Sequence, residues 1–301
     1  MKKIAILFFF LSLFSCEKDI TVEFPFEDSR FFVFSEFQSG QVFQVKVDKT
    51  YPPTGEVRFN KQFLESTEVD IYEDGVFLEK LSHAAPNSSL FSSSEFNKPL
   101  EGHSYQIRVS SDLIPEASSN PEPRLPALKI DSVWASDESA TSPLNPRIPT
   151  KLINVSLSDF SSSIPYLMFE IRGYQDNVVT SANIVSAEDF GELENPCVYS
   201  YISSKKFFKR SCFENSKATF QFYAETEGSL QEDPFGNGDI NRIEVIVSSV
   251  NDSYFDYYYK MNEPLNFFTI FEGVNPTYTT FENGYGAILT KNSSQTNLHL
   301  K

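Results

Sequence analysis

The stretch Val69-Asp70-Ile71-Tyr72-Glu73-Asp74-Gly75-Val76-Phe77-Leu78 decides the fold class of this chain. Apolar and polar residues alternate before the Asp74-Gly75 pair, which is the period of a strand with one buried face, and a second apolar segment follows it. Asp-Gly favours the tight type I′ turn, because both central positions of that turn require positive φ. The stretch therefore predicts an antiparallel β-hairpin.

Similar patterns on both sides of this hairpin predict a small β-sandwich over residues 29–115. Residues 31–34 are a continuous apolar run, and apolar residues alternate with polar ones over 43–47. Gly102 precedes Tyr105 by three residues at the start of another alternating strand. This spacing is typical of the tyrosine corner of Greek-key sandwiches, in which the phenol bonds to the backbone. We expect an immunoglobulin-like or Greek-key domain with no helix of useful length.

Prolines and small polar residues mark residues 116–127 as a Pro-rich linker before a second domain, residues 128–300. Strands are predicted there at 128–134, 153–157, 167–171, 220–223 and 243–247. Residues 136–150, which contain three more prolines, are expected to form a long loop. The chain is thus predicted to be all-β, with two tandem antiparallel β-sandwich domains.

One short aromatic helix is expected in the second domain. Residues 251–253 offer capping oxygens, and a helical period of i, i+3, i+4 and i+7 follows at Tyr254, Tyr257, Tyr258 and Met261. Two interpretations remain open. The helix closes the end of the second sandwich, or its tyrosines form a binding surface, for which their large contact area is suited.

The composition excludes several classes of protein. The 301 residues are 40% hydrophobic and 22% charged, with only 12 Gly and 17 Pro, unlike a disordered, collagen-like or multi-spanning membrane protein. The formal net charge of −16 repels phosphate backbones, so no nucleic-acid partner is expected. The chain is long enough for two domains with hydrophobic cores.

The amino terminus predicts a lipid anchor. Met1-Lys2-Lys3 is basic, and residues 4–14 form an apolar run typical of a secretory leader. This run is shorter than the about 20 residues that a bilayer-spanning helix needs. Leu13-Phe14-Ser15-Cys16 resembles the lipobox of bacterial lipoproteins, which implies cleavage before Cys16 and acylation of its sulfur. We expect a signal peptide at 1–15 and a tether at 16–28; the alternative is a plain secretory leader with a chance cysteine.

Acyl chains on Cys16 would hold the protein on a membrane without a spanning segment, because each buried methylene contributes about 0.8 kcal/mol. The residues that follow, Glu17-Lys18-Asp19, resemble the surface-export signal of Bacteroidota lipoproteins. This resemblance implies display on the cell surface from the outer leaflet of the outer membrane. The alternative is an ordinary polar tether, with the protein on the periplasmic face.

Cys197 and Cys212 are the cysteines that remain after Cys16, and the sequences between them are typical of the two strands of a hairpin. An envelope compartment permits disulfides, and closing a loop of this size contributes about 3 kcal/mol in the chain-entropy model. We expect a disulfide across this hairpin. A metal site is the alternative, but the three histidines are far apart in sequence. No residue marks a base for a catalytic cysteine.

Candidate chemistry is sparse elsewhere. Oxygen side chains gather at Asp233, Asn237, Asp239 and Asn241, and Ca²⁺ takes six to eight oxygen ligands. Their spacing matches no EF-hand, so an ordinary polar turn is expected and no metal. Phosphate-loop, G-x-S-x-G, H-E-x-x-H and C-x-x-C motifs are absent, so neither catalytic residues nor cofactors are predicted. Residues 131–133, Asp-Ser-Val, resemble the O-glycosylation sequence of Bacteroidota envelope proteins.

Eight segments follow one another along nearly the whole mature chain: Cys16-Glu17-Lys18-Asp19-Ile20, Phe32-Val33-Phe34 with Gly40, Val69–Leu78, Gly102-His103-Ser104-Tyr105, Ile130-Asp131-Ser132-Val133, Val155-Ser156-Leu157-Ser158-Asp159, Ser253-Tyr254-Phe255-Asp256-Tyr257-Tyr258 and Phe281-Glu282-Asn283-Gly284-Tyr285-Gly286-Ala287. Together they resemble the Bacteroidota lipoproteins of the domain-of-unknown-function family 4249. Asn-Gly-x-Gly in the last segment is the most distinctive, and Asn283-Gly284 favours a tight turn. Phe281 and the many phenylalanines at aliphatic positions depart from the family pattern.

The resemblance implies an outer-membrane lipoprotein associated with a TonB-dependent transporter, and it carries over no catalytic residue. The sequence therefore predicts a non-enzymatic accessory or binding partner of such a β-barrel transporter. A free-standing surface adhesin or glycan-binding module is the alternative. A third hypothesis is a hydrolase whose catalytic residues the sequence does not reveal.

Overall fold

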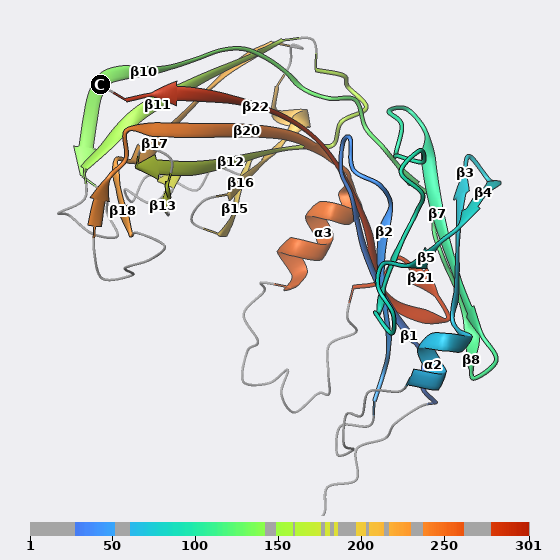
Figure 1. The fold of residues 1–301 in the computed structure, drawn as a ribbon. Coiled ribbons are helices and arrows are strands. Elements are labelled where there is room, and N and C mark those ends of the chain that lie inside the picture. Colours follow the sequence, from blue (N-terminus) through green and yellow to red (C-terminus); the bar gives the residue numbers. More distant parts are fainter. Residues whose placement is uncertain are drawn as a thin grey trace, which may run out of the picture.

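The computed structural model describes residues 28–51, 61–141, 149–158, 160–175, 178–180, 184–185, 197–202, 205–213, 217–229, 237–261 and 278–300. These residues form an all-β fold of packed sheets with two short α-helices, which confirms the predicted fold class (Figure 1). Within these ranges, no helix has the length and apolar character needed to cross a membrane.

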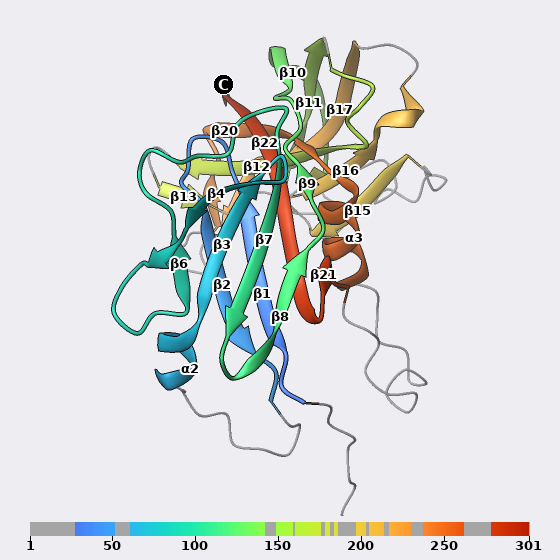
Figure 2. The ribbon, with the colours of Figure 1, turned by 90° about the vertical axis from the view of Figure 1, so that its right-hand side faces the viewer.

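The first sandwich packs a six-stranded sheet against part of a ten-stranded sheet. The six-stranded sheet contains β3 (Glu68–Glu73), β4 (Val76–Lys80), β7 (Ser104–Ser111), β8 (Ile114–Ser119), β9 (Glu122–Pro123) and β21 (Phe281–Glu282), in the order β21-β8-β7-β3-β4 with β9 beside β7. Opposite it lie β1 (Phe31–Phe37), β2 (Gln44–Lys49), β5 (Ser82–His83), β6 (Leu90–Ser92) and the start of β22 (Gly284–His299). Figure 2 shows this sandwich with β3, β7 and β8 in front.

Alternation along the strands builds the first core. Every second residue of β1 is buried, and Val45 and Val47 of β2 are fully buried beside them. The short helix α2 (Lys61–Ser66) closes one end of this core, with the ring of Phe63 at 5.8 Å from that of Phe31. This helix is not predictable from the sequence pattern, because six residues are too few to show a helical period.

The structure confirms the predicted hairpin and tyrosine corner. β3 and β4 pair antiparallel, and Asp74 and Gly75 between them have φ values of 50° and 81°, as a type I′ turn requires. The backbone N–H of Leu100 donates to the hydroxyl oxygen of Tyr105 at 2.7 Å, and that hydroxyl donates to Glu73 Oε1 at 2.6 Å. The buried tyrosine therefore ties the loop before β7 to strand β3.

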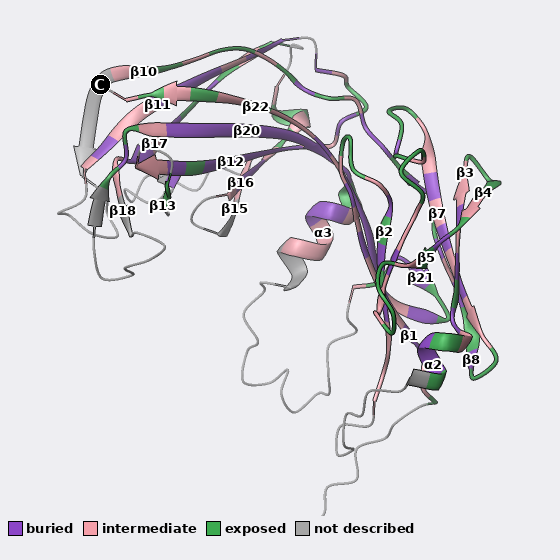
Figure 3. Ribbon diagram, viewed as in Figure 1, coloured by how far each residue is buried: buried purple, intermediate pink, exposed green. Residues whose placement is uncertain are grey.

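The second sandwich packs a four-stranded sheet against the rest of the ten-stranded sheet. The four-stranded sheet has the order β10 (Lys129–Thr141), β11 (Pro149–Ser158), β17 (Ala218–Glu225), β14 (Ile184–Val185). Facing it are β15 (Val198–Ile202), β16 (Lys205–Lys209), β12 (Tyr166–Gln175) with β13 (Val178–Thr180), β20 (Arg242–Val250) and the end of β22. The remaining elements are η3 (Arg210–Cys212), the hairpin of β18 (Glu227–Ser229) and β19 (Asn237–Asp239), and helix α3 (Asp252–Met261). Figure 3 shows that burial is most continuous along β12 and β20.

The prediction of a long loop at residues 136–150 is partly wrong. β10 continues to Thr141 and β11 begins at Pro149; residues 142–148 lie outside the described part of the chain. The pairing of β10 with β11 shifts register between Ala135 and Ser139. Among the described strands, β10 lies at the edge of its sheet, and an edge strand with such an irregularity tolerates the polar sequence that suggested a loop.

Strand β22 joins the two sandwiches. Residues 284–290 pair in parallel with β1, and residues 291–299 pair antiparallel with β20. Phe281 and Ile288 belong to the sequence segment expected to form the second domain, yet both pack in the first core. The chain therefore does not separate into two independent domains at the expected linker, because the carboxyl-terminal strand contributes to both sandwiches.

β1 and β22 approach closely at Gly286. Its φ is 109°, and a Cβ atom at this position would lie 1.8 Å from the carbonyl oxygen of Val33. The turn expected over Asn-Gly-x-Gly covers only the first part of this sequence. Asn283 has a φ of 57°, and Gly284 is already the first residue of β22. The second glycine therefore serves strand pairing rather than the turn.

Residues 116–127, expected as a linker, are integrated into the fold. β8 and β9 use part of this segment, and three side chains of β22 donate to carbonyl oxygens of residues 123–128, which we call the strap. Thr290 Oγ1 donates to the carbonyl of Pro123 at 2.7 Å, Asn292 Nδ2 to that of Leu125 at 3.1 Å, and Ser294 Oγ to that of Leu128 at 2.5 Å. Proline lacks a backbone N–H group but keeps its carbonyl group. The carbonyl groups of this Pro-rich strap therefore remain available to accept hydrogen bonds from the side chains of β22.

The two sandwiches form an arch. The ten-stranded sheet turns where β22 passes from β1 to β20, and α3 lies in the inner corner of the turn (Figure 1). We call the side of this sheet that carries α3 the inner face.

Candidate functional site

Helix α3 begins at a well-defined cap. The side-chain oxygen of Asn251 accepts a hydrogen bond from the N–H of Tyr254 at 2.9 Å, which confirms the predicted capping function. Asn251 Nδ2 and Ser253 Oγ donate to the two carboxyl oxygens of Glu122 at 2.5 and 2.6 Å. A carboxyl group on β9 thus fixes the start of the helix.

Glu122 is enclosed between the two sandwiches, with 6% of its surface exposed. Burial penalises the charged form and raises the pKa of Glu122 to about 7. The negative charge of Asp252 acts in the same direction, and the hydrogen bond from Ser253 opposes it. This carboxyl group therefore titrates near neutral pH at the point where α3 contacts the strand β9.

Aromatic rings hold α3 against the inner face. Phe255 stacks on Tyr166 with ring centroids 4.1 Å apart and meets Phe207 edge-on at 5.5 Å. Tyr254 lies between Phe207 and Tyr258, at 6.3 and 4.8 Å from their rings. Offset and edge-on contacts of this kind contribute about 0.5–1.5 kcal/mol each beyond the buried area, so the helix is firmly seated.

The three tyrosines expected as a binding surface differ in exposure. Tyr254 is 1% exposed and belongs to the core under the helix, where burial raises its pKa. Tyr257 packs against Phe34 of β1 with ring centroids 5.5 Å apart, and the hydroxyl of Tyr258 donates to Glu36 Oε2 at 3.4 Å. Of the three, only Tyr257 and Tyr258 reach solvent in part. The helix packs against β1 of the first sandwich as well as against the second, so it does not simply close the end of the second sandwich as predicted.

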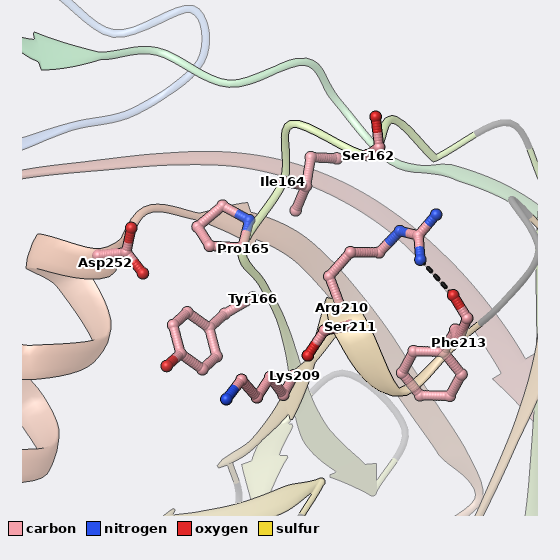
Figure 4. A pocket seen from close by; sticks show the side chains of 9 residues that line it. All are labelled: Ser162, Ile164, Pro165, Tyr166, Lys209, Arg210, Ser211, Phe213 and Asp252. Atoms are coloured by element: carbon pink, nitrogen blue, oxygen red, sulfur yellow. Dashed lines mark hydrogen bonds between the residues drawn. The ribbon is translucent and has the colours of Figure 1, made fainter.

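A pocket of about 520 Å³ opens beside the start of α3 (Figure 4). Its lining comes from the segment before β12, from β16 with η3, and from the first residue of α3: Ser162, Ile164, Pro165, Tyr166, Lys209, Arg210, Ser211, Phe213 and Asp252. The volume falls within the usual range for small-ligand sites. Because the ring of Tyr166 both lines the pocket and stacks on Phe255, the pocket and the helix share one structural element.

A disulfide stabilises one wall of this pocket. Cys197 and Cys212 are bonded, with Cα atoms 5.9 Å apart, which confirms the predicted pairing across the β15–β16 hairpin. The N–H of Lys209 donates to the carbonyl of Cys197, and the N–H of Arg210 to that of Pro165, both at 2.9 Å. The two walls of the pocket are therefore joined through the backbone.

The polar groups of the pocket carry both signs of charge. Arg210 stacks over Phe160 at 4.8 Å and donates to the carbonyl of Phe213. Lys209 and Asp252 are both exposed in the pocket lining. Burial, and then the charge of Asp252, raise the pKa of Tyr166, so its hydroxyl stays protonated at neutral pH. The pocket thus offers donors and acceptors to a small polar ligand.

An ionic network covers the inner face farther along β12. Arg172 contacts Glu170 at 3.0 Å and Glu244 at 3.5 Å, and Lys205 contacts Glu170 at 3.3 Å. Beside them the hydroxyl of Tyr174 donates to Glu244 Oε2 at 3.1 Å. These residues alternate with core residues of the second sandwich, which places them on the same face as α3. Both carboxylates are buried and paired, whereas Arg172 is half-exposed.

Other residues predicted from the sequence do not gather at this site. Cys16 and Asp233 lie outside the described residues. Asn237 and Asp239 are in β19, and the N–H of Asn241 donates to the carbonyl of Tyr174. In the described ranges, no group of three or more His, Cys, Asp or Glu side chains is arranged to hold a metal ion.

Glu122 and Tyr166 are not predictable as site residues from the sequence. Glu122 is one of 41 acidic residues and Tyr166 one of 14 tyrosines, so composition does not distinguish them. The position of Glu122 between Pro121 and Pro123 gives no local signal either, because the pairing of β9 with β7, which holds Glu122 in place, joins residues that are distant in the sequence.

The family model described as "Domain of unknown function (DUF4249)" matches residues 17–297. Because the match covers most of the chain, the chain belongs to this family. No curated protein matches it.

Proposed function

We propose that this member of the DUF4249 family is a lipid-anchored, non-enzymatic protein of a bacterial outer membrane that binds a TonB-dependent transporter as an accessory partner. The family match begins at residue 17, directly after Cys16. The expected leader and anchor therefore precede the family domain without interrupting it. The lipobox-like sequence supports the proposed lipid anchor. The resemblance to Bacteroidota lipoproteins supports the outer-membrane location and the transporter partner.

The direction in which the arch opens is the observation that carries this proposal. The first described residues enter β1 at the end of the first sandwich that is remote from the second, and the arch opens toward that side (Figure 1). An extended segment of residues 17–27 spans at most about 40 Å. A chain anchored at Cys16 would therefore hold its inner face toward the membrane, within reach of an embedded partner. A free-standing adhesin would instead direct its binding surface away from the cell.

The chemistry of the inner face fits a protein partner. Tyrosine and arginine are enriched at the centres of protein interfaces. Here the half-buried Tyr174 and Tyr258 lie on the same face as Arg172 and Arg242, with the guanidinium of Arg242 at 3.8 Å from the ring of Tyr174. Such rings and guanidinium groups offer a large contact area at low entropic cost.

Affinity purification of the tagged chain from detergent-solubilised native membranes tests the proposal. We expect a β-barrel of transporter size to co-purify with the wild-type chain. Cys16→Ser should release the protein from the membrane, whereas Arg242→Glu on the inner face should leave it anchored and lose the barrel. Lys129→Glu, on the edge strand β10, is the matched charge reversal and should retain the barrel. Recovery of the anchored wild-type chain alone would overturn the partnership.

The pocket beside α3 favours a second candidate function, a glycan-binding module. It combines the ring of Tyr166 with hydroxyl groups of Ser162 and Ser211 and with charges of both signs. Calorimetric titration with a panel of envelope and host oligosaccharides would test it. Saturable binding that Lys209→Gln weakens would support this function over the first.

A further inference from the structure

Trp134, the one tryptophan of the chain, lies on the outer surface of the second sandwich. Its neighbours along β10, Val133 and Ala135, pack against the second core, so its own side chain is directed away from that core. It is 42% exposed. Exposure of so large a ring costs free energy, and surfaces carry few such rings beyond those that a function needs.

The strand register surrounds Trp134 with amide and hydroxyl groups. Trp134 of β10 pairs with Asn154 of β11, which pairs in turn with Gln221 of β17. The neighbouring row of the same face consists of hydroxyl residues: Ser132, Ser156 and Thr219. Strands lie about 4.8 Å apart and alternate residues of a strand about 6.8 Å apart, so these two rows span about 10 Å by 7 Å. We call the four exposed side chains among them the platform: Trp134, Gln221, Ser132 and Thr219.

Asn154 holds one side chain of the platform in place. It is 4% exposed, and its Oδ1 accepts a hydrogen bond from Gln221 Nε2 at 2.8 Å. This bond uses one N–H of the Gln221 amide and leaves the second N–H and the carbonyl oxygen for a ligand. A side chain that is already oriented loses less conformational freedom on binding than a mobile one.

The platform is neutral, although the chain has a formal net charge of −16. Lys129 and Asp131, at its border on β10, pair with each other at 3.9 Å, and the row on the other side of Trp134 contains the half-buried Leu152 and Tyr223. A face without charges does not select an ionic partner. A protein interface buries about 800 Å² on each partner around an apolar centre, whereas here hydroxyl and amide groups surround one exposed ring. A neutral ligand rich in hydroxyl groups is favoured instead.

We propose that the platform binds a neutral saccharide chain. The C–H groups on one face of a pyranose ring would pack on the indole of Trp134, because an aromatic face is electronegative and attracts such hydrogens. Hydroxyl groups of the adjoining sugar would exchange hydrogen bonds with Gln221 and Thr219. The platform lies on the opposite side of the ten-stranded sheet from α3 and shares no residue with the pocket beside that helix (Figure 1). It is therefore a separate site, and a partner on the inner face leaves it accessible.

The fluorescence of Trp134 tests the proposal directly, because no other tryptophan contributes to it. The probes are neutral hexasaccharides of β-1,4-linked glucose, β-1,4-linked mannose and β-1,3-linked glucose. At least one of them should change the emission of the full-length chain saturably at concentrations up to about 5 mM. Hexagalacturonate, an anionic chain of the same length, should bind at least tenfold more weakly. The neutral complex should be equally strong at 50 and 500 mM salt, since no charged group contributes to it.

Calorimetry of variants locates the bound saccharide. Trp134→Ala should weaken binding at least tenfold, and Trp134→Phe, which keeps a ring, should recover most of that loss. Thr219→Val removes one exposed hydroxyl group without changing the shape of the side chain, and it should weaken binding severalfold.

Two further variants are the controls for this site. Phe96→Ala removes a ring that is 95% exposed on the first sandwich, and Lys209→Gln alters the pocket beside α3. Both should bind the hexasaccharide as the wild type does. No saturable change with any of the three neutral hexasaccharides, or equal binding by Trp134→Ala and the wild type, would overturn the proposal. Loss of binding in Lys209→Gln would also overturn it, because the saccharide would then occupy the pocket.

Discussion

Glu122 shows how one buried carboxyl group can depend on its surroundings for both position and charge. Its oxygens accept from Asn251 and Ser253, so the group is well bonded, yet burial outweighs these bonds and raises its pKa to about 7. Hydrogen bonds from neutral donors stabilise a carboxylate less than bulk water does when the site excludes solvent. Burial of this carboxyl group therefore makes the stability of the folded protein depend on pH.

The stability of the protein should consequently fall as the pH rises. The folded state binds the Glu122 proton more tightly than the unfolded chain, whose carboxyl group titrates near 4.5. The free energy of unfolding is expected to decrease from pH 4.5 to about 7 and then level off, by at most about 3 kcal/mol. Glu122→Gln, which resembles the protonated group, should reduce this slope and be more stable than wild type at pH 8. Urea denaturation at pH 5, 6, 7 and 8 measures the effect.

Glu95→Gln is the control for this titration, since Glu95 is exposed. It should keep the wild-type dependence on pH. An unchanged slope in Glu122→Gln would show that another group is responsible.

The environment of a residue such as Glu122 could not be predicted from the sequence, because it is formed by neighbours that are distant along the chain. Glu122 lies 129 positions from Asn251. Tyr105, by contrast, was predictable as a tyrosine corner, because its bond to the N–H of Leu100 spans five positions and leaves a local spacing signal.

At the level of elements, the parallel pairing of β1 with β22 depends on the missing side chain of Gly286. A Cβ atom there would lie 1.8 Å from the carbonyl oxygen of Val33, and the φ of 109° is itself unfavourable for other residues. Gly286→Ala should therefore separate the two strands and reduce the free energy of unfolding by about 3 kcal/mol or more. Thermal and urea denaturation measure this loss.

Gly75→Ala is the matched control for Gly286→Ala. Gly75 also has positive φ, at 81°, but a Cβ atom there would meet nothing within 4 Å. Only the backbone strain remains, which costs about 1 kcal/mol. Equal losses for the two variants would mean that the close approach to Val33 contributes nothing.

The elements show where sequence patterns succeed. The β3–β4 hairpin was predictable because its alternation and its Asp-Gly turn are both local. The extension of β10 through a polar segment and the six-residue helix α2 were not, since an edge strand needs no full apolar face and a short helix has no measurable period. The disulfide between Cys197 and Cys212 was predictable because the two cysteines flank a hairpin whose strands have a local sequence pattern.

At the level of the whole molecule, the two sandwiches depend on each other through β22 and the strap. β22 pairs with β1 up to Thr290 and with β20 from Lys291 onward. One continuous strand therefore belongs to both sandwiches and links them through its backbone. Patterns of apolar residues predicted two sandwiches but could not show that residues 281–288 return to the first. That return closes a contact with residues more than 160 positions earlier, for which a single sequence carries no signal.

The side chain of Asn292 makes three hydrogen bonds at this joint. It donates to the carbonyl of Leu125 at 3.1 Å and to Glu101 Oε2 at 3.0 Å, and its own oxygen accepts from Arg124 at 3.3 Å. Arg124 is 5% exposed, so a lost acceptor leaves a buried cation less satisfied. Asn292→Ala should reduce the free energy of unfolding by about 2–3 kcal/mol and weaken the coupling between the sandwiches.

Two probes distinguish weaker coupling from a uniform loss of stability. The fluorescence of Trp134, the one tryptophan of the chain, reports on the second sandwich, and hydrogen exchange of β3 and β7 reports on the first. Both should give one denaturation midpoint in the wild type and two separate midpoints in Asn292→Ala. Asn297→Ala, farther along β22, removes only an exposed bond to Arg242 and should behave as wild type within about 0.5 kcal/mol. Coincident midpoints in Asn292→Ala would show that the backbone of β22 couples the sandwiches without the strap.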